Sequence, residues 1–201
     1  MAVTYYKEKA FNVAENVYEP AEDTFLLADN LDAHKEERVL ELGTGCGLLA
    51  ILAAKAGAEV VATDINHSAL ECASANAVAH GVADRIDFRL GDLFEPIHDE
   101  RFDLVVFNPP YLPVQLEEAI GASLDLAWEA GPDGRAVIDR FLEKLSEHLV
   151  PNGRALLVQS SLADISKTLR VLEMNGFQAN IVREKLPFEE LFLLKCNKRR
   201  L

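Results

Sequence analysis

Residues 38–47, which read RVLELGTGCG, indicate how the whole chain folds, because an apolar segment there runs directly into a turn with three glycines. The segment Arg38–Leu42 is typical of a buried strand, and the apolar run Leu48–Ala56 is typical of a helix that ends at Gly57. A strand, a glycine-rich turn and a helix in this order predict the first unit of a parallel α/β sheet.

The same alternation continues along the chain. We expect further strands at residues 59–63, 85–90, 102–107 and 155–158, and helices at residues 67–80, 133–149 and 163–174. Residues 177–183 and 191–195 read as two final strands that can form an antiparallel pair. This order predicts a largely parallel sheet with helices on both faces and right-handed crossovers.

We expect one domain over residues 1–201. Met1–Val17 is mixed and aperiodic and is assigned to an extended N-terminal extension. Residues 18–195 form the expected core, which starts with a short helix whose first turn is acidic, and residues 196–201 form a basic tail. Pro151-Asn152-Gly153 is expected to be a turn.

The composition indicates a soluble, cytoplasmic protein. The formal net charge of −13 repels phosphate backbones and argues against direct nucleic-acid binding. The three cysteines lie far apart without a CxxC pair, so neither a disulfide framework nor a metal site is expected. We expect no signal peptide and no membrane contact, since the apolar runs are shorter than the ~20 residues that span a bilayer.

The glycine turn predicts a cationic nucleoside cofactor. A dinucleotide fingerprint would read GxGxxG, but in Glu41-Leu42-Gly43-Thr44-Gly45-Cys46-Gly47 the third glycine comes one residue early. The carboxylate of Glu41 beside the turn would repel a pyrophosphate and attract a sulfonium or an ammonium group. Asp64, 21 residues after Gly43, has the spacing of an acid that binds ribose hydroxyls.

Two more strand ends carry polar side chains. Asp92, after the strand at 85–90, can accept from an adenine amino group, with Leu93 and Phe94 beside the ring. Asn108-Pro109-Pro110-Tyr111 follows the strand at 102–107. Because ligands of open parallel sheets bind beyond the carboxyl ends of the strands, these residues are expected to meet the glycine turn and Asp64 at one edge.

The Asn-Pro-Pro-Tyr segment predicts a site for a planar amino group. Proline fixes φ and restricts the residue before it, so the Asn108 side-chain carbonyl and the Pro109 carbonyl can point the same way. Two convergent acceptors suit an NH2 group with two hydrogens to donate, and the Tyr111 ring offers a face for stacking. A carboxamide or the exocyclic amine of a base fits this description.

Taken together, ELGTGCG, Asp64, GDLF and NPPY resemble the Rossmann-type S-adenosylmethionine-dependent methyltransferases. The stretch Val17–Phe25, VYEPAEDTF, is similar to the short archaeal and eukaryotic branch of the HemK-type protein glutamine methyltransferases. The resemblance covers residues 17–195. It implies a class I methyltransferase fold with a seven-stranded, mostly parallel sheet that contains one antiparallel strand.

The resemblance also implies an activity and a set of roles. The expected reaction is methylation of the amide nitrogen of the glutamine in the Gly-Gly-Gln motif of a class I peptide chain release factor. Asn108, Pro109, Pro110 and Tyr111 would be catalytic, with Asn108 and Tyr111 binding the substrate. S-adenosylmethionine would be bound by Thr24, Glu41, Gly43, Gly45, Gly47, Asp64, Ile65, Asp92, Leu93 and Asn108.

A protein partner is expected as well. The family branch implies a heterodimer with a small zinc-binding activator, and we expect the strand at 85–90 to lie at a sheet edge and to pair with it. Three other functions remain open at this stage. They are a nucleic-acid adenine or guanine amino methyltransferase, a protein lysine methyltransferase, and a scaffold protein that binds the cofactor without catalysis.

Overall fold

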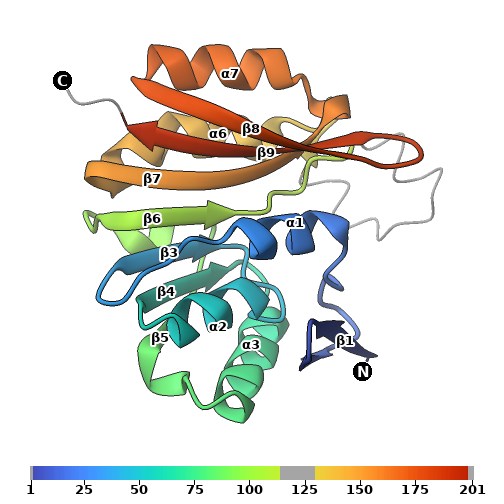
Figure 1. Cartoon of the computed structure of the whole chain (residues 1–201), viewed down its shortest axis with the longest axis vertical. Helices are drawn as coiled ribbons and strands as arrows, with labels where there is room; N and C mark the ends of the chain where they lie inside the picture. Colours follow the sequence, from blue (N-terminus) through green and yellow to red (C-terminus); the bar gives the residue numbers. More distant parts are fainter. Residues whose placement is uncertain (1, 114–129, 199–201) are drawn as a thin grey trace.

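The computed structural model describes residues 2–113 and 130–198. Trp128, which the sequence places in the connection after the Asn-Pro-Pro-Tyr segment, lies outside these residues. The main sheet has seven strands in the order β5-β4-β3-β6-β7-β9-β8 (Figure 1). Its strands are β3 (Arg38–Leu42), β4 (Glu59–Asp64), β5 (Ile86–Leu90), β6 (Phe102–Phe107), β7 (Leu149–Ser160), β8 (Phe177–Lys185) and β9 (Glu190–Lys198).

The strand directions confirm the expected class I methyltransferase topology. Strands β3 to β7 are mutually parallel, and β9 lies antiparallel between β7 and β8. The strand that was expected at residues 85–90 forms one edge of the sheet, as β5. At the other end of the chain, β9 runs to Lys198, so the sheet includes three residues that the sequence assigned to the basic tail.

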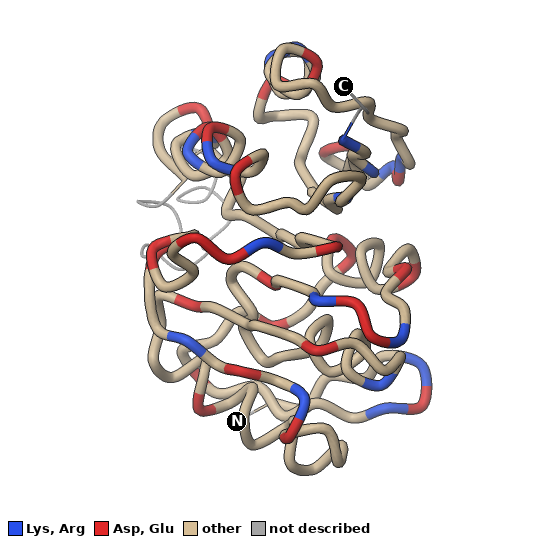
Figure 2. The backbone as a smooth tube through the Cα atoms, turned by 90° about the vertical axis from the view of Figure 1, so that its left-hand side faces the viewer, with Lys and Arg blue, Asp and Glu red and all other residues tan. Residues whose placement is uncertain are grey.

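Helices cover both faces of the sheet. In Figure 1, α1 and α2 lie in front of the strands and α6 lies behind them. Acidic and basic residues are interspersed over the described backbone (Figure 2). Within the described ranges, no helix has the length and apolar character needed to cross a membrane. The helices are α1 (Glu22–Asn30), α2 (Leu48–Lys55), α3 (His67–Ala79), α6 (Ala136–Lys144) and α7 (Ile165–Met174).

The region between α6 and the centre of β7 differs from the expectation. The helix expected over 133–149 ends at Lys144, and a 3₁₀ turn, Leu145–His148, leads directly into β7. Pro151-Asn152-Gly153 is a bulge inside β7, since the pairing with β6 shifts between Phe102 and Leu104. Pairing of Leu149 and Arg154 with β6, on either side of the segment, keeps it within the strand, although its sequence is typical of a turn.

Residues 2–13, which were expected to be extended and aperiodic, form a β-hairpin of β1 (Ala2–Tyr6) and β2 (Lys9–Val13). The side chain of Asn76 on α3 fastens it, because its Oδ1 accepts from Asn12 N at 3.0 Å and its Nδ2 donates to Asn12 O at 2.8 Å. The same Nδ2 donates to Cys46 O in the glycine turn at 2.8 Å. Asn76 therefore connects the hairpin to the turn after β3.

Candidate active site

The carboxyl ends of β3, β4 and β6 meet at one edge of the sheet. In the register, Leu42 lies beside both Thr63 and Phe107. Gly43, Asp64 and Asn108 each follow these three positions directly, so the sequence-predicted residues converge as expected. A Cβ on Gly43 would lie 3.7 Å from the Phe107 ring and 4.0 Å from the Asn108 carbonyl oxygen.

The glycine turn is held by hydrogen bonds to the end of β4. Thr44 N donates to Thr63 O at 2.9 Å, and Gly45 N donates to Asp64 Oδ2 at 2.9 Å. Gly47 has φ +84°, and a Cβ at this position would lie 2.9 Å from Ala73 Cβ on α3. Only glycine allows this backbone conformation and this approach at the same time, so helices α2 and α3 can pack closely at the turn.

Glu41 connects the glycine turn to helix α2 through hydrogen bonds. Its side chain is 3% exposed, and its Oε2 accepts from Thr44 Oγ1 at 2.6 Å and from Ala50 N at 3.0 Å. Burial raises the pKa of this carboxyl to about 8. A cation placed beside Glu41 would favour its charged form, and this effect connects the ionisation of Glu41 with the binding of a positively charged ligand.

Asp64 uses both of its carboxylate oxygens in the protein. Oδ1 accepts from Asn66 N and Oδ2 from Gly45 N, each at 2.9 Å. Burial raises the pKa of Asp64 above its ordinary value, and these backbone hydrogen bonds oppose the rise. A carboxylate offers about four lone-pair sites, so Asp64 retains acceptor capacity for hydroxyl groups of a ligand.

Asn108 has one amide atom fixed and the other without a partner. Its Nδ2 donates to Thr24 Oγ1 at 3.2 Å, and that hydroxyl donates to Asp23 Oδ1 at 3.2 Å. Asn108 Oδ1 is buried and has no hydrogen-bond partner among the described residues. An unpaired buried acceptor costs about 1–3 kcal/mol. The arrangement therefore favours a ligand that donates a hydrogen bond at this atom.

Asp23 organises the residues around Asn108. Tyr111 Oη donates to Asp23 Oδ2 at 2.8 Å, Tyr18 Oη donates to the same carboxylate at 3.1 Å, and Thr24 N donates to Oδ1 at 2.5 Å. We call Tyr18, Asp23, Thr24, Asn108 and Tyr111 the Asp23 network. Asp23 was not among the sequence-predicted site residues, although it precedes Thr24 in the EPAEDT stretch.

Tyr111 has a use for its hydroxyl that the sequence did not reveal. Its side chain is 8% exposed, and burial, followed by the charge of Asp23, raises the pKa of its phenol well above 10. The hydroxyl therefore stays protonated and remains a donor to Asp23. The predicted stacking face of the ring and the predicted acceptor role of the Pro109 carbonyl stay predictions.

The residues after β4 and β5 are less closely linked to this cluster. Asp92 Oδ2 lies 2.6 Å from an Arg140 guanidinium nitrogen on α6, Ile65 is 57% exposed, and Leu93 has φ +48°. Phe94 is buried and stacks on Phe141 and His148, with ring centroids 5.8 and 4.4 Å apart. Phe94 therefore belongs to the core. The adenine role of Asp92 and Leu93 stays a prediction.

Known proteins share this architecture and much of the sequence. Residues 18–124 match the family model described as the methyltransferase small domain. A putative protein N5-glutamine methyltransferase of Methanocaldococcus jannaschii is 43% identical over 182 residues, which cover 90% of this chain and 91% of that protein. The methyltransferase HEMK2 of Homo sapiens is 35% identical over 195 residues, covering 91% and 90% of the two chains.

A solved structure is similar over nearly its whole length. It comes from the E. cuniculi Mtq2-Trm112 complex, which is described as responsible for methylation of the translation termination factor eRF1. The likeness has a TM-score of 0.71 and 30% identity, and it covers 91% of this chain and 99% of that one.

Proposed function

Because this chain belongs to the methyltransferase family that includes the protein N5-glutamine methyltransferases, we propose that it methylates the glutamine of the Gly-Gly-Gln motif in a class I peptide chain release factor. The acceptor atom is the side-chain amide nitrogen. The relatives support this substrate, since one of them is named a release factor glutamine methyltransferase and the Mtq2 complex acts on eRF1. A release factor substrate also favours a cytoplasmic location.

One observation carries the proposal, namely the unpaired and buried Oδ1 of Asn108. The hydrogen bond from Asn108 Nδ2 to Thr24 orients the amide, so that its acceptor is the atom left for the substrate. A glutamine carboxamide has two N–H groups, of which one can donate to Asn108 Oδ1 and the other to the Pro109 carbonyl. The ring of Tyr111 would lie against the planar carboxamide.

The residues at the strand ends fit S-adenosylmethionine, which supplies a methyl group on a positively charged sulfur. Glu41 at the turn suits a positive charge, Asp64 has acceptor capacity for the ribose, and Asp92 and Leu93 would hold the adenine. Thr24, Ile65, Asn108 and the turn glycines Gly43, Gly45 and Gly47 would complete the cofactor site. This assignment follows the resemblance residue by residue.

The main contribution of the chain to catalysis is alignment. An amide nitrogen is a weak nucleophile, because its lone pair is delocalised into the carbonyl. Holding that nitrogen in line with the methyl group can supply ~7–11 kcal/mol of the barrier reduction. The acceptors Asn108 Oδ1 and Pro109 O would also stabilise positive charge that develops on the nitrogen during transfer.

The test is transfer of labelled methyl groups from S-adenosylmethionine to an intact class I release factor. A matched substrate in which the Gly-Gly-Gln glutamine is replaced by alanine is the control. We expect label on the first substrate and none on the second. Label that persists on the alanine substrate, or that appears on a lysine or on RNA instead, would contradict the proposal.

We also propose a heterodimer with a small zinc-binding activator. The edge strand β5 and helix α3 border a groove of about 600 Å³, which includes Val78, Phe88 and Leu90 among its lining residues. Val78 is 66% exposed and Leu90 is 55% exposed. An apolar surface beside a free strand edge suits a partner that adds a strand and covers the groove. The related Mtq2 structure is a complex with Trm112.

Co-expression with a candidate activator tests this interface. The variants Val78→Asp and Leu90→Asp should each prevent co-purification, whereas Met174→Asp, at a residue that is 85% exposed on α7, should not. A wild-type chain that is soluble and fully active alone would count against the heterodimer. Retention of the partner by Leu90→Asp would count against this location.

A further inference from the structure

The turn between β8 and β9 extends beyond the same edge of the sheet as Asn108. Strand β8 points in the same direction as β7, because each is antiparallel to β9. Ser160 at the end of β7 pairs with Leu191, so residues 186–189 lie just past the carboxyl ends of the parallel strands. Figure 1 shows this turn on the side of the molecule toward which the arrow of β6 points.

The turn is well anchored and presents an aromatic ring to solvent. Leu186 N donates to Glu189 O at 2.9 Å across it, and Glu190 N donates to Ser161 Oγ at 3.1 Å. Phe188 at the tip is 96% exposed, although it is a large apolar side chain. Leu162, next to the anchoring Ser161, is also an exposed apolar residue. A fixed backbone that exposes a phenyl ring is typical of a contact surface.

Glu189 in the same turn lies within electrostatic reach of Tyr18 and Tyr111, two members of the Asp23 network. Its Oε2 is buried and has no hydrogen-bond partner among the described residues, a condition it shares with Asn108 Oδ1. After burial and the contribution of Asp23, the charge of Glu189 adds to the rise in the pKa of both Tyr18 and Tyr111. Glu189 therefore lies close enough to both tyrosines for its charge to act on them.

The surroundings of Glu189 carry uncompensated negative charge. The residues that act electrostatically on Tyr18 are Asp23, Glu22 and Glu189, all of which are acidic. No salt bridge joins any of the three to a described lysine, arginine or histidine. A positively charged side chain of a bound molecule would satisfy Glu189 and reduce this repulsion.

We propose that Phe188 and Glu189 form a docking surface for the polypeptide segment that carries the methylated glutamine. The segment would place an apolar side chain against Phe188 and a lysine or arginine against Glu189. This inference rests on the proposed function and adds a second point of substrate contact, at residues that flank the glutamine. It assigns a binding role to a turn outside the Asn-Pro-Pro-Tyr segment.

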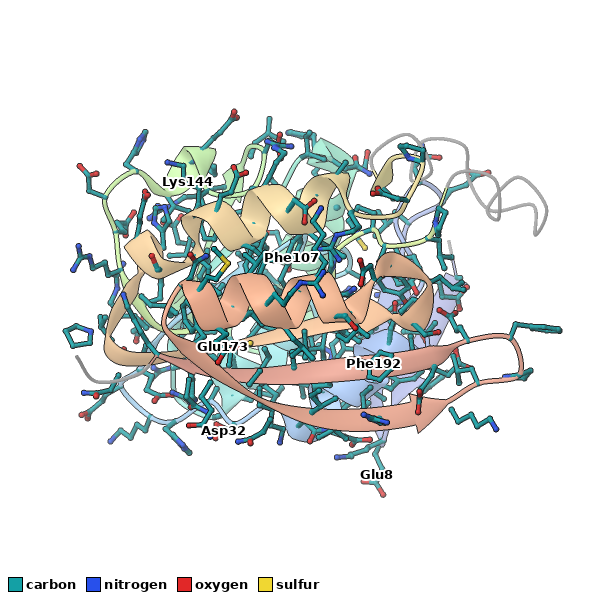
Figure 3. All side chains as sticks on the ribbon, turned by 90° about the horizontal axis from the view of Figure 1, so that it is seen from above. Glu8, Asp32, Phe107, Lys144, Glu173 and Phe192 are labelled. Atoms are coloured by element: carbon teal, nitrogen blue, oxygen red, sulfur yellow. The ribbon has the colours of Figure 1, made fainter. Side chains whose placement is uncertain are left out.

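The test compares steady-state methylation of an intact release factor by the variants Phe188→Ser and Glu189→Gln. Each should raise KM about tenfold, which corresponds to about 1.4 kcal/mol of binding, with a much smaller change in kcat. The affinity for S-adenosylmethionine should be unchanged. Met174→Ser and Glu173→Gln are the controls, because both residues are exposed and end α7. Figure 3 shows Glu173 far from the turn between β8 and β9.

A charge reversal tests the electrostatic part separately. Glu189→Lys should methylate the natural substrate poorly and should recover on a substrate whose basic residues beside the glutamine are changed to glutamate. An unchanged KM for Phe188→Ser and Glu189→Gln would overturn the docking surface while leaving the proposed function intact. A dimer of the wild-type chain that Phe188→Ser makes monomeric would also overturn it, since the turn would then bind a second copy. If the wild-type chain does not methylate the release factor, the proposed function itself fails.

Discussion

Tyr111→Phe separates the hydroxyl of this residue from its ring. The change removes one buried donor to Asp23, at 2.8 Å, and leaves the phenyl group in place. A hydrogen bond to a charged group contributes about 1.5–3 kcal/mol. Asp23 would keep Tyr18 and both Thr24 donors, so the carboxylate would not be left unpaired. We therefore expect the free energy of unfolding to fall by about 1.5–2 kcal/mol.

Tyr18→Phe is the matched control. Tyr18 donates to the same carboxylate, but its hydroxyl lies 3.1 Å from both carboxylate oxygens, so its hydrogen bond is longer than that of Tyr111. We expect a loss of about 0.5–1 kcal/mol for this variant. Because the two tyrosines share one acceptor, the double variant should not be additive.

The assay is urea unfolding, with the midpoint compared at constant slope. For a chain of this size, the expected loss for Tyr111→Phe lowers Tm by roughly 3–8 °C. The raised pKa of the Tyr111 phenol adds a second signature. Its contribution to stability is present below pH 10 and is lost as the pH rises above that value, so Tyr111→Phe should weaken the decline of stability above pH 10. Equal losses for the two variants, or a loss below about 0.5 kcal/mol for Tyr111→Phe, would refute the reasoning.

Three further changes probe other parts of the site. Asp23→Asn should lower kcat by about tenfold to a hundredfold and change the cofactor affinity little, because Asn108 is oriented through Thr24 and Asp23. Normal turnover by a folded variant would contradict the positioning role of Asp23. Glu41→Gln should abolish the loss of stability that the wild type undergoes between about pH 5 and pH 8, because a folded pKa of about 8, above the ordinary 4.5, makes ionisation of Glu41 unfavourable in the folded state. Urea unfolding at both pH values checks this, and the same change of stability with pH in the variant and the wild type would contradict it. Gly47→Ala should lower the free energy of unfolding by about 2–4 kcal/mol, because of its positive φ and the 2.9 Å approach to Ala73, whereas Gly81→Ala, with φ +70° and no atom within 4 Å of the added Cβ, should lower it by only about 1–2 kcal/mol. Similar thermal midpoints for the two variants would refute the packing argument.

The sheet could be predicted because its signals are local. Apolar runs such as 102–107 and the glycine turn after Leu42 each mark an element within a few residues, and the strand ends follow from them. The bulge in β7 could not be predicted in this way. Its Pro-Asn-Gly sequence favours a turn, and the pairing of the flanking residues Leu149 and Arg154 with β6 keeps it in the sheet.

Long-range contacts account for what the sequence did not reveal. The hairpin β1–β2 depends on Asn76, which lies 64 residues from its partner Asn12. Asp23 receives Tyr111 from 88 residues away, so no local spacing marks it as the centre of a network. Likewise, the ion pair between Asp92 and Arg140 joins residues 48 positions apart. Convergence of Gly43, Asp64 and Asn108, in contrast, follows from parallel strand order alone.

The grip of Asn108 on a glutamine amide is tested most directly by methyl transfer from saturating S-adenosylmethionine to the intact release factor by Asn108→Ala. With Oδ1 removed, we expect turnover below about a tenth of the wild-type rate, while folding and most of the cofactor affinity are kept. Turnover above about a tenth of the wild-type rate, from a folded variant that binds the cofactor, would contradict the proposed role of this side chain.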